Sequence, residues 1–193
     1  MKIVFKISFT AVVLALVVAG GARPAHADQV YYTTTDLLAD FFRSSQNVTY
    51  KKVQIDDSER TRLQRRLGYT PAKASYTFYV ATSGGHIDGY AFIDEEKGEH
   101  LPITFAVKLS PAGKVMRQEI VVYREARGDE VRDEHFRAQF VGKSAADAID
   151  TNQDIMAVSG ATISSRAMAV GVKRALVLFD ELVRPTANAT AAR

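Results

Sequence analysis

Four β-prone runs follow one another between residues 75 and 125, and they constrain the fold more than any other feature of the chain. Each run is rich in Tyr, Phe, Val and Ile, as half-buried strands are. In chain order the runs are SYTFYVAT, IDGYAFID, PITFAVKLS and KVMRQEIVVYRE. Only short connections separate them, and the last is a tight link that contains Gly113, so neighbouring runs are expected to pair as hairpins. The pattern predicts an antiparallel meander with one face on a hydrophobic core.

Helical patterns flank this meander on both sides. The segments expected to be helical are Thr33–Ser45, Asp57–Leu67, 133–141, 144–149 and Ser164–Val183. The second ends at Gly68, a residue typical of helix C-termini. The last carries one continuous apolar stripe, formed by Met168, Val172, Leu176, Phe179 and Val183. The order of helices, strands and helices predicts an α+β fold, in which helices flank an antiparallel β-sheet meander and a long C-terminal helix closes the domain.

The first 27 residues have the layout of a secretory signal peptide. Lys2 and Lys6 introduce an apolar run, and Ala25-His26-Ala27 is a small-x-small cleavage sequence. The run is short for a membrane span, so an uncleaved anchor is the weaker alternative. We therefore expect an exported chain with one domain over residues 28–183 and a flexible tail over residues 184–193.

Composition narrows the class of function. Three of the 25 Lys and Arg residues lie in the leader, which has no acidic residue, and the others are balanced by the 22 Asp and Glu. This balance gives no reason to expect a nucleic-acid partner. The chain has no cysteine, which excludes disulfides, thiolate-held iron–sulfur clusters and CxxCH haem attachment. Its histidines lack a metal-binding spacing, and it has no GxSxG, GxGxxG or P-loop sequence.

The entrance of the long helix, VSGATISSRAM, is rich in small and hydroxyl residues. Its hydroxyl residues are Ser159, Thr162, Ser164 and Ser165. The unsatisfied N–H groups and the dipole of a first helical turn favour an anion, and Gly160 and Ala161 would let a phosphate approach the backbone. The residues alone leave two interpretations open: Thr162 or Ser164 caps the helix, or a phosphate binds here.

The stretch SGATISSRAM, Ser159 to Met168, resembles the flavin-attachment motif of the FMN-binding domain family. GYAFIDEEKGEHLPITFAVKLSPAGKV, YREARG and FRAQFVGKS are similar to further blocks of that family in the same order, so the resemblance covers roughly Tyr76 to Leu182. The family includes exported flavoprotein subunits of sodium-pumping quinone reductases and of Rnf-type electron-transport complexes. The resemblance implies that a flavin transferase joins FMN through its phosphate to the threonine of the [ST]GA[TS] sequence, here Thr162.

The resemblance also implies the surroundings of the flavin. Besides Thr162, the residues expected around FMN are Ser159, Gly160, Ala161, Thr104, Glu125, Gly128 and Lys143. The first three would lie at the phosphate, whereas Lys143 is equally well interpreted as a solvated surface lysine. The ring would lie between the sheet and the loop that leads to the long helix. The expected function is electron exchange with a membrane-bound redox partner, as a carrier without a small substrate of its own.

The chain departs from the family at one position. The family usually has an aspartate six residues before the acceptor, and this chain has Met156 there, with Asp154 two residues away. The departure leaves two alternatives open: non-covalently bound FMN, and a non-redox accessory or binding domain without flavin. A flavin reductase or fumarate-type oxidoreductase has less support, because no second catalytic domain is evident.

Overall fold

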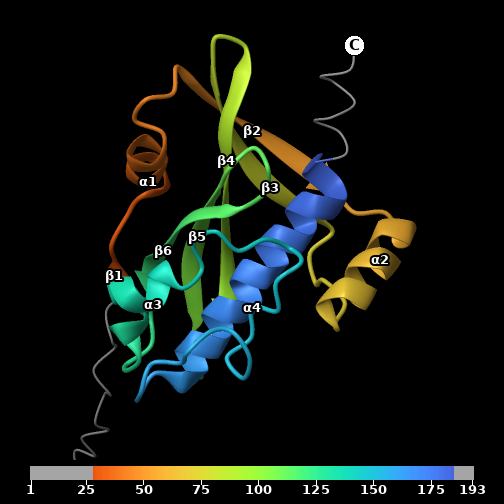
Figure 1. Ribbon diagram of the computed structural model, residues 1–193. Coiled ribbons are helices and arrows are strands. Elements are labelled where there is room, and N and C mark those ends of the chain that lie inside the picture. The colour runs from red at the N-terminus through yellow and green to blue at the C-terminus, as the bar shows by residue number, and fades with distance from the viewer. Residues whose placement is uncertain (1–27, 185–193) are drawn as a thin grey trace, which may run out of the picture.

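The four β-prone runs form the centre of a six-stranded antiparallel sheet in the computed structural model, which describes residues 28–184 (Figure 1). The strands are β1 (Gln29–Val30), β2 (Asn47–Gln54), β3 (Ser75–Ser83), β4 (His86–Lys97), β5 (Pro102–Leu109) and β6 (Val115–Tyr123). Their order in the sheet is β1-β6-β5-β4-β3-β2. The predicted meander is therefore confirmed as β3 to β6, and the α+β fold class with it.

The helices are α1 (Thr34–Phe41), α2 (Asp57–Leu67), α3 (Glu134–Ala138) and α4 (Thr162–Leu178). A 3₁₀ turn, η1 (Asp129–Arg132), precedes α3, and a π-helical turn, η2 (Phe179–Val183), continues α4. In residues 28–184 no helix is both long and apolar enough to cross a membrane. The predicted leader (residues 1–27) and residues 185–193 of the predicted tail lie outside the described residues.

Two outer strands, β1 and β2, were not predicted. The strand β2 is an edge strand that pairs only with β3 among the described strands, and all its residues are exposed or half-buried. An edge strand that is exposed to solvent on both faces lacks the alternation of apolar and polar residues by which a strand is predicted from the sequence. The strand β1 has two residues and is fixed by its pairing with β6 rather than by its own composition.

The two faces of the sheet are covered differently because neighbouring residues in a strand point to opposite faces. On one face Phe92 and Phe105 belong to the main core, together with α4. On the other, their neighbours Ala91 and Ala106 pack with α1, whose Leu37 is fully buried. Large rings on one face thus build the core, and small side chains on the other leave room for a short helix.

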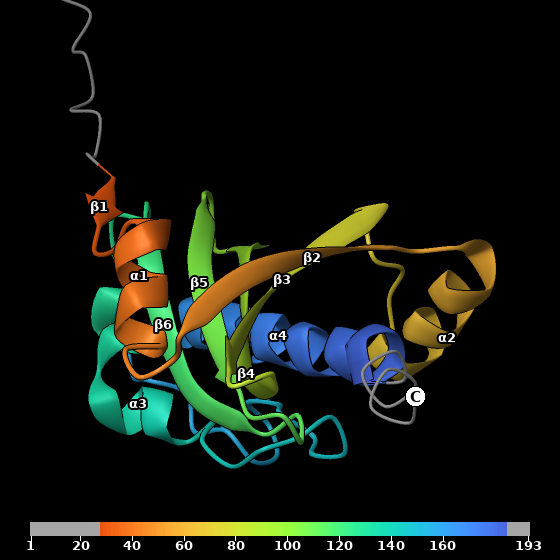
Figure 2. The ribbon, with the colours of Figure 1, turned by 90° about the horizontal axis from the view of Figure 1, so that it is seen from above.

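Helix α4 lies along the main core over its whole length (Figure 2). All five residues of the predicted apolar stripe are buried, which confirms that prediction. The helix begins at Thr162, two residues earlier than expected. At Gly171 the helix lies close to β5: an added Cβ would lie 2.6 Å from two ring atoms of Phe105. Glycine at this position therefore sets the distance between α4 and β5.

A buried ion pair adds a polar contact between α4 and β4. The Arg174 guanidinium lies 2.9 Å from the Asp94 carboxylate, and the two side chains are only 8% and 3% exposed. It also donates to the backbone carbonyl of Glu95 at 2.8 Å. Burial alone would lower the pKa of Arg174, but Asp94, Tyr69 and Glu96 together outweigh it and raise the pKa. The Arg174 guanidinium is thus charged and paired, as buried ionic groups must be.

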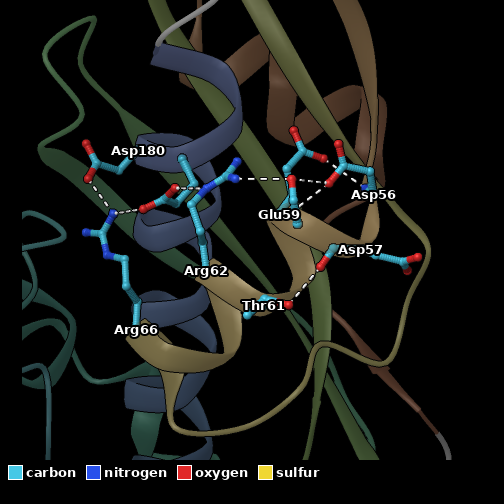
Figure 3. A network of polar contacts seen from close by, with 9 residues as sticks. Asp56, Asp57, Glu59, Thr61, Arg62, Arg66 and Asp180 are labelled. Atoms are coloured by element: carbon cyan, nitrogen blue, oxygen red, sulfur yellow. Dashed lines mark hydrogen bonds and ion pairs between the residues drawn. The ribbon is translucent and has the colours of Figure 1, made fainter.

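The far end of α4 is fastened to α2 by a surface ion-pair network. Figure 3 shows Arg62 and Arg66 of α2 pointing toward η2. Arg66 lies 2.7 Å from Asp180 and 2.8 Å from Glu181, and Arg62 lies 3.1 Å from Glu181. At the other end of α2, Asp56 and Glu59 form a capping box. The predicted stop of α2 at Gly68 is confirmed by its left-handed backbone, with φ of +78°.

Three predicted helices need correction. Residues 144–149 form turns rather than a helix. The Asp147 carboxylate accepts hydrogen bonds from the backbone N–H and the hydroxyl of Ser144, at 2.8 and 2.9 Å, and such local bonds compete with helical ones. The helix expected over residues 133–141 is limited to Glu134–Ala138, and the one expected over Thr33–Ser45 is limited to Thr34–Phe41.

The Gly171–Phe105 contact yields a stability prediction. In an exposed helix, Gly→Ala raises the free energy of unfolding by roughly 1 kcal/mol. Here Gly171→Ala is expected to lower it by about 1–2 kcal/mol, because the new methyl group overlaps the Phe105 ring. Urea unfolding would measure this, and adding Phe105→Leu should recover part of the loss. A Gly171→Ala protein as stable as the wild type would contradict the close packing.

Candidate functional site

The SGAT segment forms an exposed turn that leads into α4. Ser159 and Gly160 are exposed, and Gly160 has a left-handed backbone with φ of +81°. A Cβ at Gly160 would have no atom within 4 Å, so the space beside this residue is open. Ala161 is buried at the N-cap position, and the exposed Thr162 is the first residue of the helix.

The serines of the first turn do not cap the helix. No side chain of the described residues caps α4. Ser164 is 5% exposed and its hydroxyl bonds the Tyr123 hydroxyl at 2.8 Å. Ser165 is fully buried and its hydroxyl accepts the Val158 N–H at 3.0 Å. The capping interpretation of Thr162 or Ser164 is therefore wrong. The hydroxyls of Ser164 and Ser165 bond to Tyr123 and Val158, and no side-chain oxygen of the described residues accepts the N–H groups of the first turn.

A surface pocket of about 310 Å³ lies at this helix entrance. Its lining residues are Glu99, Glu125, Arg127, Gly128, Gly160, Ala161, Thr162, Ile163 and Ser164. They come from the β4–β5 turn, the segment that follows β6, and the start of α4. Of the residues expected around FMN, the structure thus brings together Thr162, Gly160, Ala161, Glu125 and Gly128.

The Tyr123 hydroxyl holds two walls of the pocket together. It donates to the Arg127 carbonyl, so the Ser164 hydroxyl donates to the Tyr123 oxygen. Burial raises the pKa of Tyr123 to about 12. Gly128 has φ of +93°, and a Cβ there would lie 2.7 Å from both the Ser164 and Tyr123 oxygens. Only glycine fits this position, because both the backbone conformation and the space require it.

Glu125 fixes the third wall of the pocket. Its carboxylate is 5% exposed and accepts the backbone N–H groups of His100 and Leu101 at 2.6 and 2.9 Å. These bonds tie the β4–β5 turn to the segment that follows β6. Through these two hydrogen bonds Glu125 determines the shape of the pocket.

Three residues expected near the flavin do not line this pocket. Ser159 lies beside it, in the turn before Gly160. Thr104 lies on β5, where its hydroxyl donates to Glu95 at 3.0 Å and accepts from Arg124 at 2.9 Å. Lys143 donates to Asp154 at 2.7 Å, and its carbonyl accepts the N–H of Val115 at the start of β6. The pocket follows the other end of β6, so Lys143 lies far from it.

The segment before the SGAT turn is fixed by two sets of contacts. The Asp154 carboxylate pairs with Lys143 and accepts the Asp150 N–H at 2.9 Å. Partial burial alone would raise the pKa of Asp154, but the Lys143 bond and backbone N–H bonds lower it. Met156 is 79% exposed, while its backbone exchanges two hydrogen bonds with the Gln139 amide. Met156 has no carboxylate, and the Asp154 carboxylate is held by Lys143 and the Asp150 N–H. Neither residue therefore offers a free carboxylate to Thr162.

A second hollow, of about 530 Å³, lies beside this segment. Its lining residues are Glu130, Asp133, His135, Phe136, Gln139, Met156, Ala157 and Val158. The exposed thioether of Met156 and the side chain of Val158 give it an apolar wall close to the SGAT turn.

Sequence reasoning missed Arg127. It lies in the YREARG stretch between two expected site residues, Glu125 and Gly128, and it is exposed at the pocket. Its position within that stretch was the available signal. Among residues 28–184, no group of His, Asp and Glu side chains is arranged to hold a metal ion.

Known proteins match this chain over most of its length. Residues 73–177 match the model of the FMN-binding domain family. A component of the proton-translocating ferredoxin:NAD(+) oxidoreductase complex of Clostridium ljungdahlii is 31% identical over 155 residues, which cover 76% of this chain and 78% of that protein. The crystal structure of Shewanella oneidensis NqrC has the same fold, with a TM-score of 0.50 over 82% of this chain and 89% of that one, at 19% identity.

The hydrogen bonds of Tyr123 yield a prediction of stability and its pH dependence. Tyr123→Phe should lower the free energy of unfolding by about 1–2 kcal/mol at neutral pH, because the Arg127 carbonyl and the Ser164 hydroxyl lose a partner. The folded state keeps the phenol protonated to about pH 12, whereas the unfolded chain releases this proton near pH 10.0. Wild-type stability should therefore fall relative to the variant as the pH rises from 10 to about 12.

Urea unfolding at several pH values would measure both effects. Tyr50→Phe is the matched control, because Tyr50 is 73% exposed on β2, and its stability at neutral pH should equal that of the wild type. If the difference between wild type and Tyr123→Phe stayed constant above pH 10, the buried Tyr123 phenol would not be the titrating group.

Proposed function

The chain belongs to the FMN-binding domain family, and from this we propose that it is an exported electron-transfer protein that carries FMN on Thr162. One observation carries the proposal. Thr162, the residue that the family motif marks as the acceptor, is exposed at the uncapped start of α4 and lines a pocket. The neighbouring Ser164 and Ser165 are buried and bonded, so they compete poorly as acceptors.

The residues at the helix entrance fit a flavin phosphate. The open N–H groups of the first turn of α4 and its dipole favour an anion there. The open space beside Gly160 lets a phosphate approach the backbone, and a side chain at that position would fill it. The pocket also contains a guanidinium, Arg127. The donors present thus suit the phosphate of FMN, and none of them needs a metal ion.

Covalent attachment at Thr162 is a phosphoryl-type transfer. The Thr162 Oγ1 loses its proton to a base of the transferase and forms a new bond to phosphorus. A phosphate monoester has no good leaving group, so the donor must be a flavin dinucleotide whose nucleoside monophosphate departs with the electron pair. The product is a phosphodiester with one negative charge, placed where the α4 dipole stabilises it.

Once bound, FMN supplies the redox chemistry, and the protein supplies position and retention. The phosphodiester needs no thiol, which agrees with a chain that has no cysteine. It also keeps the flavin with an exported protein in a compartment where lost cofactor is not readily replaced. The Clostridium relative belongs to a proton-translocating oxidoreductase complex, which supports a membrane-bound electron-transport partner for this chain.

A second candidate function is favoured by Met156 and Asp154. The chain has no aspartate at the usual position, and the nearby Asp154 is held by Lys143 and the Asp150 N–H. If the transferase requires a free carboxylate there, the chain would bind FMN without a covalent bond or serve as an accessory domain without flavin. Attachment before folding would avoid this obstacle, because the Lys143–Asp154 pair would not yet exist.

The attachment prediction concerns Thr162. When the protein is exported from a host that has a flavin transferase, its intact mass should increase by one FMN less one water, and flavin fluorescence should persist after denaturation in a gel. Thr162→Ala should abolish both signals. Thr162→Ser should keep part of them, because it retains a hydroxyl at the same exposed position.

Ser159→Ala is the matched control, because Ser159 is an exposed hydroxyl three residues before Thr162. It should retain most of the attached flavin. Loss of flavin in Ser159→Ala but not in Thr162→Ala would move the acceptor to Ser159. An unmodified mass with colour that is lost on denaturation would indicate non-covalent FMN.

A further inference from the structure

Arg127 is a cation at the pocket, and no residue that the structure describes pairs with its side chain. It is exposed and lines the pocket with Thr162 and Gly160. Its guanidinium forms no ion pair and no hydrogen bond with any residue that the structure describes. Arg124, another cation of the segment after β6, is engaged, because it pairs with Asp28 and Glu95. Arg127 is therefore available to a ligand without breaking a contact.

The charges around the pocket make this cation necessary for an anionic ligand. The other ionisable side chains of its lining are the carboxylates of Glu99 and Glu125. Two carboxylates beside a phosphate oppose its binding, and a helix N-terminus supplies only about half a positive charge. With Arg127 the formal charge of the lining side chains is −1, from two carboxylates and one guanidinium, and without Arg127 it would be −2. Arg127 thus offsets charge that the start of α4 cannot offset alone.

The backbone of Arg127 is held in place although its side chain is free. Its carbonyl accepts the Tyr123 hydroxyl, and the next residue, Gly128, is held by its left-handed backbone against Tyr123 and Ser164. The base of the side chain is therefore fixed relative to the first turn of α4. A planar guanidinium on a fixed base is suited to two parallel hydrogen bonds with phosphate oxygens.

We propose that Arg127 binds the phosphate of FMN through its guanidinium and makes this pocket select a phosphorylated flavin over riboflavin. This rests on the proposed function, because it takes the flavin phosphate to lie at Thr162. Arg127 acts as a positioning residue that places the phosphorus beside the Thr162 hydroxyl and afterwards pairs with the phosphodiester.

The test compares two ligands that differ only in the phosphate. Unmodified protein, produced without a flavin transferase, is titrated with FMN and with riboflavin, and the quenching of flavin fluorescence gives both affinities. The wild type should bind FMN more tightly. Arg127→Gln should weaken FMN binding about tenfold or more, as expected for a charged hydrogen-bonding pair, and leave riboflavin binding unchanged. Arg127→Lys should retain part of the preference.

Arg65→Gln is the matched control, because Arg65 is an exposed arginine on α2, which packs near the other end of α4. It makes the same change in net charge and should leave both affinities unchanged. Arg166→Gln tests for a general charge effect, since Arg166 is exposed on α4 but does not line the pocket. All four variants should unfold at the wild-type urea concentration.

Three outcomes would overturn the assignment of Arg127. They are equal binding of FMN and riboflavin by the wild type, an unchanged preference in Arg127→Gln, and an equal loss in Arg166→Gln. None of them affects attachment at Thr162, which the mass measurement tests separately.

A second measurement applies if neither flavin binds the unmodified protein. The phosphorus-31 chemical shift of flavin-loaded protein should then change in Arg127→Gln and not in Arg65→Gln. An unchanged shift in both variants would overturn the assignment of Arg127. Protein that neither binds nor receives FMN would overturn the proposed function as well.

Discussion

The close contact of α4 with the sheet at Gly171 determines where everything else lies. Because a glycine faces the Phe105 ring, the helix axis approaches β5 closely and the stripe on either side of Gly171 is buried. One end of the helix is thereby brought to the β4–β5 turn and the segment after β6. The other end reaches α2, where Arg66 and Glu181 pair. The packing of α4 on the sheet thus brings the walls of the pocket together.

The parts of the fold that could be predicted are those with a local cause. Strands β3 to β6 have strong β composition and short turns, and α4 has an apolar stripe that recurs every three or four residues. The edge strand β2 has no such pattern, because its residues are half-buried at most and its place depends on pairing with β3. Residues 144–149 look helical by composition, but the Ser144–Asp147 bonds favour turns.

The residues of the site likewise include some that could be predicted from the sequence and others that depend on the fold. The motif at the start of α4, and the Glu125 and Gly128 positions, could be found from the sequence, because they lie in recognisable blocks. The buried hydrogen bonds of Ser164 and Ser165 could not be predicted from the sequence, because their partners Tyr123 and Val158 are brought to them by the fold. The same is true of Arg127, whose availability depends on what surrounds it, and of Lys143, whose distance from the pocket depends on the direction of β6.

The division of the hydroxyls around α4 has an angular consequence. Successive residues of a helix are turned by about 100°, so Thr162 faces solvent while Ser164 and Ser165 face the interior. A deletion or insertion of one residue between Gly160 and Ser165 would rotate Thr162 toward the core and bring a different side chain to the surface. An enzyme that acts on a hydroxyl of the folded chain would therefore depend on its direction around the helix axis as well as on the sequence. Ser164 and Ser165, two and three residues after Thr162, are not interchangeable with it.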